Sequence, residues 1–107
     1  QQEVETKVEQ LRQQVILTEE DWLNFKTLFA KVYPQFFDQL RQLAPDITTA
    51  EQRMAALIRL FNDNKQIASV LGISVDSVRK TRRRLSQRLS VDGEEVEGLM
   101  LRLSKMA

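Results

Sequence analysis

The sequence KQIASVLGISVDSVRKTRRRLSQRL, from Lys65 to Leu89, decides the fold of this chain. Its pattern predicts a short helix over residues 65–71, a three-residue turn, and a second helix over residues 75–88. Ser74 is a suitable N-cap for the second helix, because its hydroxyl can accept a hydrogen bond from an amide of the first turn. Gly72 can adopt the positive φ that a tight exit from the first helix requires. The stretch therefore has the layout of a helix-turn-helix.

The second predicted helix has two chemically different sides. At about 100° per residue its apolar side chains share one narrow face, which comprises Val78, Leu85 and Leu89. The opposite side carries polar and charged residues, namely Asp76, Lys80, Arg83 and Gln87, flanked by Arg79 and Arg84. A helix with one buried edge and one cationic edge suits the DNA major groove, where phosphates supply affinity and contacts to guanine supply sequence readout.

A basic run of this kind has a simpler interpretation, since Arg82-Arg83-Arg84 could be a solvated face or a patch for an acidic partner. The turn spacing, the cap and the separation of apolar from basic sides favour nucleic acid. The net charge of only +1 conceals a concentrated positive field: residues 65–90 hold seven basic residues and one acidic, whereas residues 1–64 hold seven basic and ten acidic.

Composition excludes several classes of chemistry. The 107 residues are enough for one compact helical domain with an appendage, and they contain no Cys and no His. The absence of Cys and His excludes disulfides, zinc fingers and thiol or imidazole nucleophiles in this sequence. The absence of Cys is also compatible with a cytoplasmic location. No apolar run reaches the length of a membrane span, and the first residues of the sequence do not have a signal-peptide pattern. Because the chain starts at Gln1, inside a helical repeat and without an initiator Met, we expect a fragment of a larger protein.

Residues 1–17 are predicted to form a coiled-coil or linker helix. Apolar residues recur at spacings of four, three and four, the repeat of a coiled-coil seam, at Val4, Val8, Leu11 and Val15. Two heptads are too few to be stable alone, so the segment is expected either to dimerise within a longer coil or to pack back on the domain. A parallel dimer would place Lys7 beside Arg12 of the other copy, which is a like-charge pair.

Residues 18–46 are predicted to be a helical extension that packs on the core. Thr18 is a candidate N-cap followed by acidic residues, and Pro34 is expected to open a second helix over residues 35–43 at its first turn. Apolar residues at helical spacing line both helices and are interpreted as core rather than as a ligand site: Trp22, Phe25, Phe29, Val32, Phe36, Phe37, Leu40 and Leu43.

Residues 47–107 are predicted to form the remaining domain. Thr48 and Glu51 form a capping box for a helix that braces the two-helix motif through Met54, Leu57, Ile58 and Phe61. A turn after Leu89 precedes a final helix over residues 94–105. Because no strand pattern occurs, the predicted fold class is all-α: a helix-turn-helix four-helix domain preceded by N-terminal helices.

Several short motifs between residues 47 and 91 occur together: Ile47-Thr48, Glu51, Lys65-Gln66-Ile67-Ala68, Leu71-Gly72-Ile73-Ser74, Val78-Arg79 and Arg88-Leu89. This combination, which covers about 45 of the 107 residues, resembles the LuxR-type DNA-binding domain. Residues 29–46 and the final helix look like the version of this domain at the C-terminus of large regulators in Bacteroidetes-type bacteria. Those regulators carry it behind a coiled segment, a membrane span and a sensor, so the fragment is expected to be cytoplasmic.

The resemblance implies a sequence-specific DNA-binding output domain of a bacterial transcriptional regulator, with double-stranded DNA as its partner and a homodimer as its active form. It implies base contacts from Arg79, Lys80 and Arg83, in agreement with the cationic side inferred above. It further implies phosphate contacts that hold the helix in place, from Lys65, Ser77, Thr81, Arg84 and Arg88. Thr81 stands where the family has a His.

Two alternative functions remain open. One is a sigma-factor-like promoter-reading module, which would bind RNA polymerase, and the other is a helical interaction module for an acidic protein. Catalysis is not expected, because carboxylates occur singly at helix starts and His and Cys are absent. With only three glycines the chain has no phosphate-binding loop, so we expect no catalytic residue, cofactor, metal or small-molecule site in this fragment.

Overall fold

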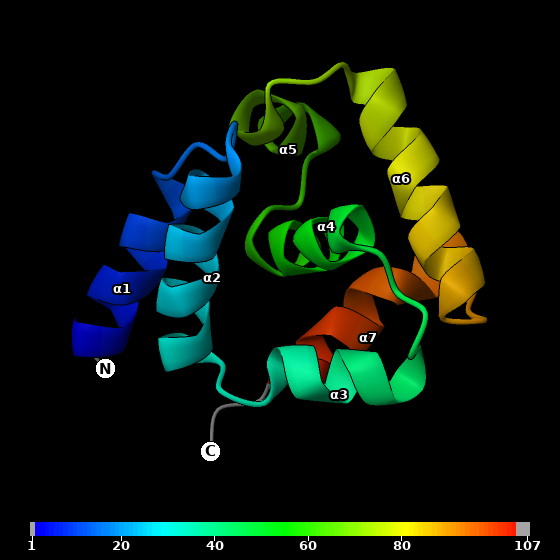
Figure 1. The fold of residues 1–107 in the computed structure, drawn as a ribbon, viewed down its shortest axis with the longest axis horizontal. Helices are drawn as coiled ribbons and strands as arrows, with labels where there is room; N and C mark the ends of the chain where they lie inside the picture. The colour runs from blue at the N-terminus through cyan, green and yellow to red at the C-terminus, as the bar shows by residue number, and fades with distance from the viewer. Residues whose placement is uncertain (1, 105–107) are drawn as a thin grey trace.

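The computed structural model describes the backbone of residues 2–104 and the side chains from residue 5 to residue 104. In this part of the chain every regular element is a helix, so the all-α prediction is confirmed (Figure 1). The elements are α1 (Gln2–Arg12), α2 (Glu19–Val32), α3 (Phe36–Leu43), α4 (Thr49–Leu60), α5 (Asn64–Leu71), α6 (Val75–Arg88), a 3₁₀ turn η1 (Gly93–Glu95) and α7 (Val96–Leu103).

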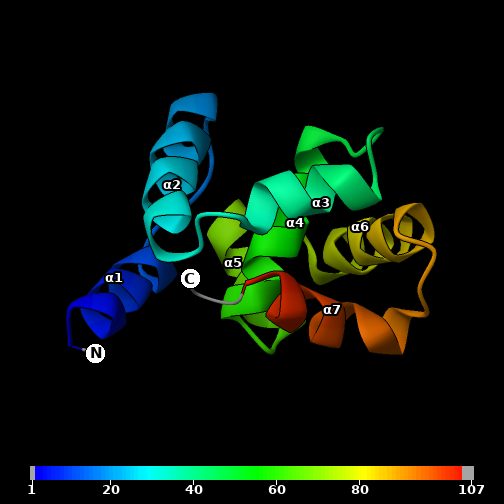
Figure 2. The ribbon, with the colours of Figure 1, turned by 90° about the horizontal axis from the view of Figure 1, so that it is seen from below.

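Helix α4 is the centre of the molecule, and α5, α6 and α7 pack against it (Figures 1 and 2). Its middle turns are fully buried and include two small residues, Ala55 and Ala56, beside Met54 and Leu57. Small side chains on a buried helix let neighbouring helices approach closely. Both views place α6 at the edge of the molecule opposite α1 and α2, so none of the described helices lies against one long side of α6.

The aromatic residues of α2 and α3 form a continuous buried cluster, as predicted. Phe29 lies at its centre, with ring centroids 5.0 Å from those of Tyr33 and Phe36 and 5.3 Å from that of Phe37. Tilted and edge-on ring pairs at these separations are favourable beyond the area they bury. The prediction is wrong for one core residue, because Leu43, at the end of α3, is 53% exposed.

The predicted caps are present, whereas some predicted boundaries shift. Thr18 and Thr48 each form a capping box with the residue three positions later. Helix α3 begins at Phe36, so Pro34 lies in the preceding turn rather than in the first turn of the helix. The predicted final helix is divided into η1 and α7, and its expected end at residue 105 lies outside the described residues.

Helix α1 is shorter than the predicted coiled-coil segment. It ends at Arg12, so Val15 lies in the following loop and is 51% exposed. Leu11 is fully buried in the core of its own chain, and the Arg12 Nε donates to the carbonyl of Leu60, 3.3 Å away. The side chain of Val4 lies outside the described part. The described residues of α1 therefore pack on the domain, beside α2 (Figure 1).

Candidate nucleic-acid interface

Two helices joined by a three-residue turn form the base of the site, as the sequence predicts. Gly72 ends α5 in the left-handed region, at φ 65°, and the amides of Gly72 and Ile73 both donate to the carbonyl of Ala68. Ser74 caps α6, because its hydroxyl accepts a hydrogen bond of 3.1 Å from the amide of Ser77. These local hydrogen bonds fix the direction in which α6 leaves the turn.

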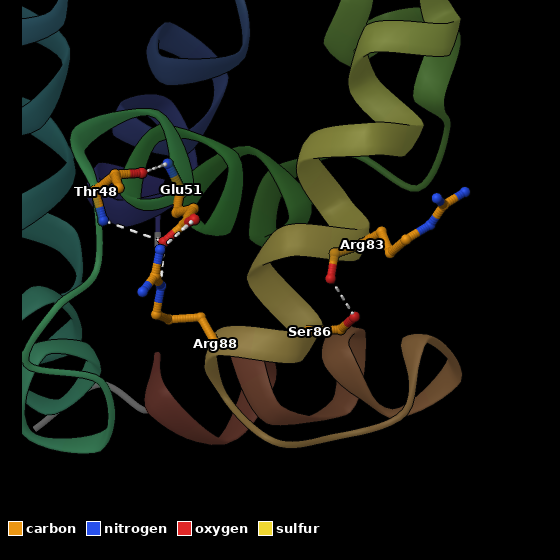
Figure 3. A network of polar contacts seen from close by, with 5 residues as sticks. All are labelled: Thr48, Glu51, Arg83, Ser86 and Arg88. Carbon is orange, nitrogen blue, oxygen red and sulfur yellow. Dashed lines mark hydrogen bonds and ion pairs between the residues drawn. The ribbon is translucent and has the colours of Figure 1, made fainter.

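The apolar edge of α6 is buried as expected. Val78 and Leu85 are fully buried and Leu89 packs partly against the same core. Ser86, which the sequence analysis did not single out, is also buried, and its hydroxyl donates to the carbonyl of Arg83 over 2.8 Å (Figure 3). This backbone contact satisfies the buried hydroxyl without a partner from another helix.

The cationic edge of α6 is exposed to solvent. Arg79, Lys80, Arg83 and Arg84 are all exposed, and Figure 3 shows the Arg83 side chain directed away from the other helices. Among the described residues no hydrogen bond or ion pair involves the guanidinium groups of Arg79, Arg83 and Arg84. The three predicted base-contacting residues therefore lie on one accessible surface.

Lys80 has one carboxylate neighbour. Its Nζ lies 3.3 Å from Oδ2 of Asp76, one turn earlier, and the two side chains are 61% and 70% exposed. A solvent-exposed pair at this spacing contributes at most about 0.5 kcal/mol. A phosphate or a base edge can therefore displace Asp76 from Lys80 at little cost.

Arg88, one of the predicted phosphate-contacting residues, is paired with a carboxylate of its own chain. Its guanidinium binds the carboxylate of Glu51 with both ends, Nε to Oε1 at 2.9 Å and Nη2 to Oε2 at 3.2 Å (Figure 3). Glu51 is buried and also accepts the amide of Thr48, so one carboxylate joins the start of α4 to the end of α6. Arg88 thus connects the end of α6 to Glu51, and its predicted phosphate contact stays a prediction.

The Glu51 carboxyl is ionised because of these partners. Burial by itself raises its pKa, but the hydrogen bonds from Arg88 and from the Thr48 amide outweigh this effect and hold the pKa below its ordinary value. The same hydrogen bond raises the pKa of Arg88. The pair is therefore charged throughout the neutral pH range.

Arg82 is held in a similar way on the other flank of α6. Its Nη2 donates to Oε1 of Glu97 in α7 over 3.1 Å, and its side chain is only 17% exposed. Beside it lies a hollow of about 470 Å³, which Lys65 and Arg79 also line. From the sequence, Arg82 is only one member of the basic run Arg82-Arg83-Arg84. Its position, 40° from the centre of the apolar face at 100° per residue, is the signal that could have indicated partial burial.

The predicted phosphate-contacting residues are distributed over both flanks. Lys65 is exposed in the first turn of α5, and Ser77 is exposed in the first turn of α6. Arg84 is exposed on the same flank of α6 as Arg88, and both residues line a hollow of about 300 Å³. Thr81 is half-buried and does not belong to the outward surface.

Comparison with known proteins gives no family model, no curated protein and no solved structure with a significant match to this chain. Within residues 2–104 no helix is both long enough and apolar enough to cross a membrane. No group of three or more metal-binding side chains occurs among the residues whose side chains are described. The assignment of function therefore depends on the chemistry of the α6 surface.

Proposed function

We propose that this chain is the sequence-specific DNA-binding output domain of a bacterial transcriptional regulator of the LuxR type, in which α5 and α6 form a helix-turn-helix. The observation that carries the proposal is the exposed cationic edge of α6, which lies opposite an edge buried against α4. A helix fits into the major groove, about 12 Å wide, only when one side is free of other elements, and α6 meets this condition among the elements that the structure describes (Figure 1).

The residues divide by the surface on which they lie. Arg79, Lys80 and Arg83 contact base edges, because long cationic side chains on the outward surface can reach the groove floor. Phosphate contacts come from residues around that surface: Lys65, Ser77, Thr81 and Arg84. The half-buried Thr81 offers only its hydroxyl, and Arg88 acts through Glu51 by positioning the helix.

The active form is a homodimer that places two α6 helices about one DNA turn apart, so the preferred operator has two related half-sites. Partners are double-stranded DNA and a second copy of the chain, with RNA polymerase as a further partner at promoters. A cytoplasmic location, as part of a longer membrane-anchored regulator, follows from the same proposal.

The test is a fluorescence anisotropy titration with duplex DNA at several salt concentrations, after selection of a preferred sequence from a random duplex pool. The wild-type chain should lose affinity steeply as salt rises. Lys80→Ala and Arg83→Ala should each weaken binding to the selected duplex by about five- to 100-fold. Lys31→Ala removes the same charge from the last turn of α2, on the opposite edge of the molecule, and should change affinity little.

A flat salt response, or equal effects of Lys31→Ala and Arg83→Ala, would refute the proposal. Capture of an acidic protein that persists in excess DNA would favour an interaction module instead. Co-purification with the RNA polymerase core, without binding to free duplex, would favour a sigma-factor-like module.

A further inference from the structure

The flank of α6 that faces α7 contains a hollow with an unusual combination of charges. Its lining includes three cationic side chains from two helices, Lys65 of α5 and Arg79 and Arg82 of α6. Two carboxylates, Asp63 and Glu97, line the same hollow. A smaller hollow of about 300 Å³ adjoins it and shares Arg79 and Arg82. The cations therefore converge on one space beside the outward surface of α6.

The two carboxylates have different roles. Asp63 is the N-cap of α5, because its Oδ1 accepts the amide of Lys65 over 2.8 Å. Glu97 has no capping bond, and its contact with Arg82 is the one ion pair that it forms within the described residues. Glu97 is 53% exposed at its side chain, whereas Arg82 is 17% exposed. The guanidinium is therefore held in place by packing, and the carboxylate is the member that can return to water.

We propose that Arg82 binds a phosphate of the DNA backbone and that Glu97 is the carboxylate which this phosphate replaces. The inference rests on the proposed function. It adds to that function a phosphate-binding residue, Arg82, and a carboxylate of the same chain, Glu97, that competes with the DNA phosphate for Arg82.

Several physical reasons favour the exchange. A partly exposed carboxylate pairs weakly with a guanidinium because water solvates both groups well. A backbone phosphate can accept two parallel hydrogen bonds from the same guanidinium, and it gains the attraction of Lys65 and Arg79 at the same hollow. Arg79 joins the two surfaces, since it lines the hollow and also belongs to the outward edge of α6. A duplex that contacts this edge therefore brings its backbone towards Arg82.

The pairing of Glu97 with Arg82 affects affinity and leaves selectivity unchanged. Glu97 lowers the affinity for any duplex by the same factor, because phosphate contacts carry no sequence information. The ratio of the affinities for selected and random duplexes is still set by base contacts from Lys80 and Arg83.

The experiment measures affinity and its salt dependence by anisotropy for four variants and the wild-type chain, each checked for helicity and melting temperature. Glu97→Gln should bind both selected and random duplexes about two- to fivefold more tightly, since it removes a competitor worth one weak ion pair. Arg82→Gln should weaken binding to both duplexes and reduce the slope of log affinity against log salt by about one.

The controls separate displacement from general electrostatics. Glu94→Gln removes one negative charge, as Glu97→Gln does, but from an exposed side chain of η1 two residues before the start of α7. It should strengthen binding much less than Glu97→Gln. In the double variant Arg82→Gln with Glu97→Gln, the gain from the second substitution should disappear, because the two residues act through one interaction.

The outcomes are distinguishable. If Glu97→Gln gains no more than Glu94→Gln, or if its gain persists without Arg82, the inference fails while the DNA-binding proposal stands. If the wild-type chain shows no salt-dependent binding to duplex DNA, the proposed function fails and the inference fails with it.

Discussion

Replacement of Glu51 tests how the DNA-facing helix is held in place. Glu51 connects two distant parts of the chain, because its carboxylate accepts hydrogen bonds from Arg88, at the end of α6, and from the amide of Thr48, before α4. Glu51→Gln removes the charge but keeps an amide oxygen that can still complete the capping box. Glu51→Ala removes both the charge and the cap.

The two substitutions should lower the free energy of unfolding by different amounts. Hydrogen bonds to charged groups contribute about 1.5–3 kcal/mol, and a value at or just below the lower end applies here because the Arg88 side chain is 35% exposed and water screens the charge. Glu51→Gln should therefore cost about 1–1.5 kcal/mol. Glu51→Ala adds a lost cap of about 1 kcal/mol and the loss of buried methylene contacts of about 0.8 kcal/mol, which gives about 3 kcal/mol. For a chain of this size about 1 kcal/mol lowers the melting temperature by about 4 °C.

The assay is urea denaturation followed by circular dichroism as a function of pH. The folded-state pKa of Glu51 lies below its ordinary value of 4.5, so the stability it contributes is present above that value and is lost as the pH falls through the lowered pKa. The difference in the free energy of unfolding between wild type and Glu51→Gln should be constant near neutral pH and should shrink in acid. Arg88 remains protonated over this range.

The matched control is Glu20→Gln, in the first turn of α2, where the side chain is exposed. It should change the free energy of unfolding by less than about 0.5 kcal/mol. The reasoning is refuted if the Glu20 and Glu51 variants are equally stable, or if the stability gap does not narrow in acid.

Three further predictions concern the rest of the fold. Gly72→Ala should destabilise the chain by about 1–2 kcal/mol in thermal melts, because φ is 65° and an added Cβ would lie 2.6 Å from Cδ2 of Leu17. In a Leu17→Ala background the steric contact is absent, but Gly72→Ala should still destabilise the chain because of the positive φ. Leu85→Ala should cost about 2–5 kcal/mol by urea denaturation, and Leu101→Ala, at an exposed position of α7, much less. Hydrogen bonds from the amides of residues 17 and 18 lower the pKa of Asp21, so the ionised carboxylate stabilises the fold above that pKa. Asp21→Asn should therefore be less stable than the wild type at about pH 6, and the difference should disappear as the pH falls through the lowered pKa. Urea denaturation from about pH 6 to about pH 2 measures this difference.

Features set by neighbouring residues could be predicted from the sequence. The caps at Thr18, Thr48 and Ser74 and the positive φ of Gly72 each depend on groups within a few positions along the chain, so the pattern alone indicates them. The division of α6 into a buried and an exposed edge follows from helical periodicity in the same way.

Contacts between distant residues could not be predicted in this way. Glu51 is recognisable as a capping residue, but no spacing indicates that it pairs with Arg88, 37 positions later. The pairing of Arg82 with Glu97 likewise depends on how α7 packs beside α6. Leu43 is the opposite case, since its place on the apolar face of α3 does not reveal that its side chain is 53% exposed.

The most direct test of the central claim is an NMR titration of the labelled chain with its selected duplex. The account predicts that the largest amide shift changes fall in α6 and in the first turn of α5, around Lys65, Lys80 and Arg83, and that amides of α1 and α2 change little. Shift changes centred on α1 to α3, with α6 unaffected, would contradict the assignment of α6 as the DNA-binding surface.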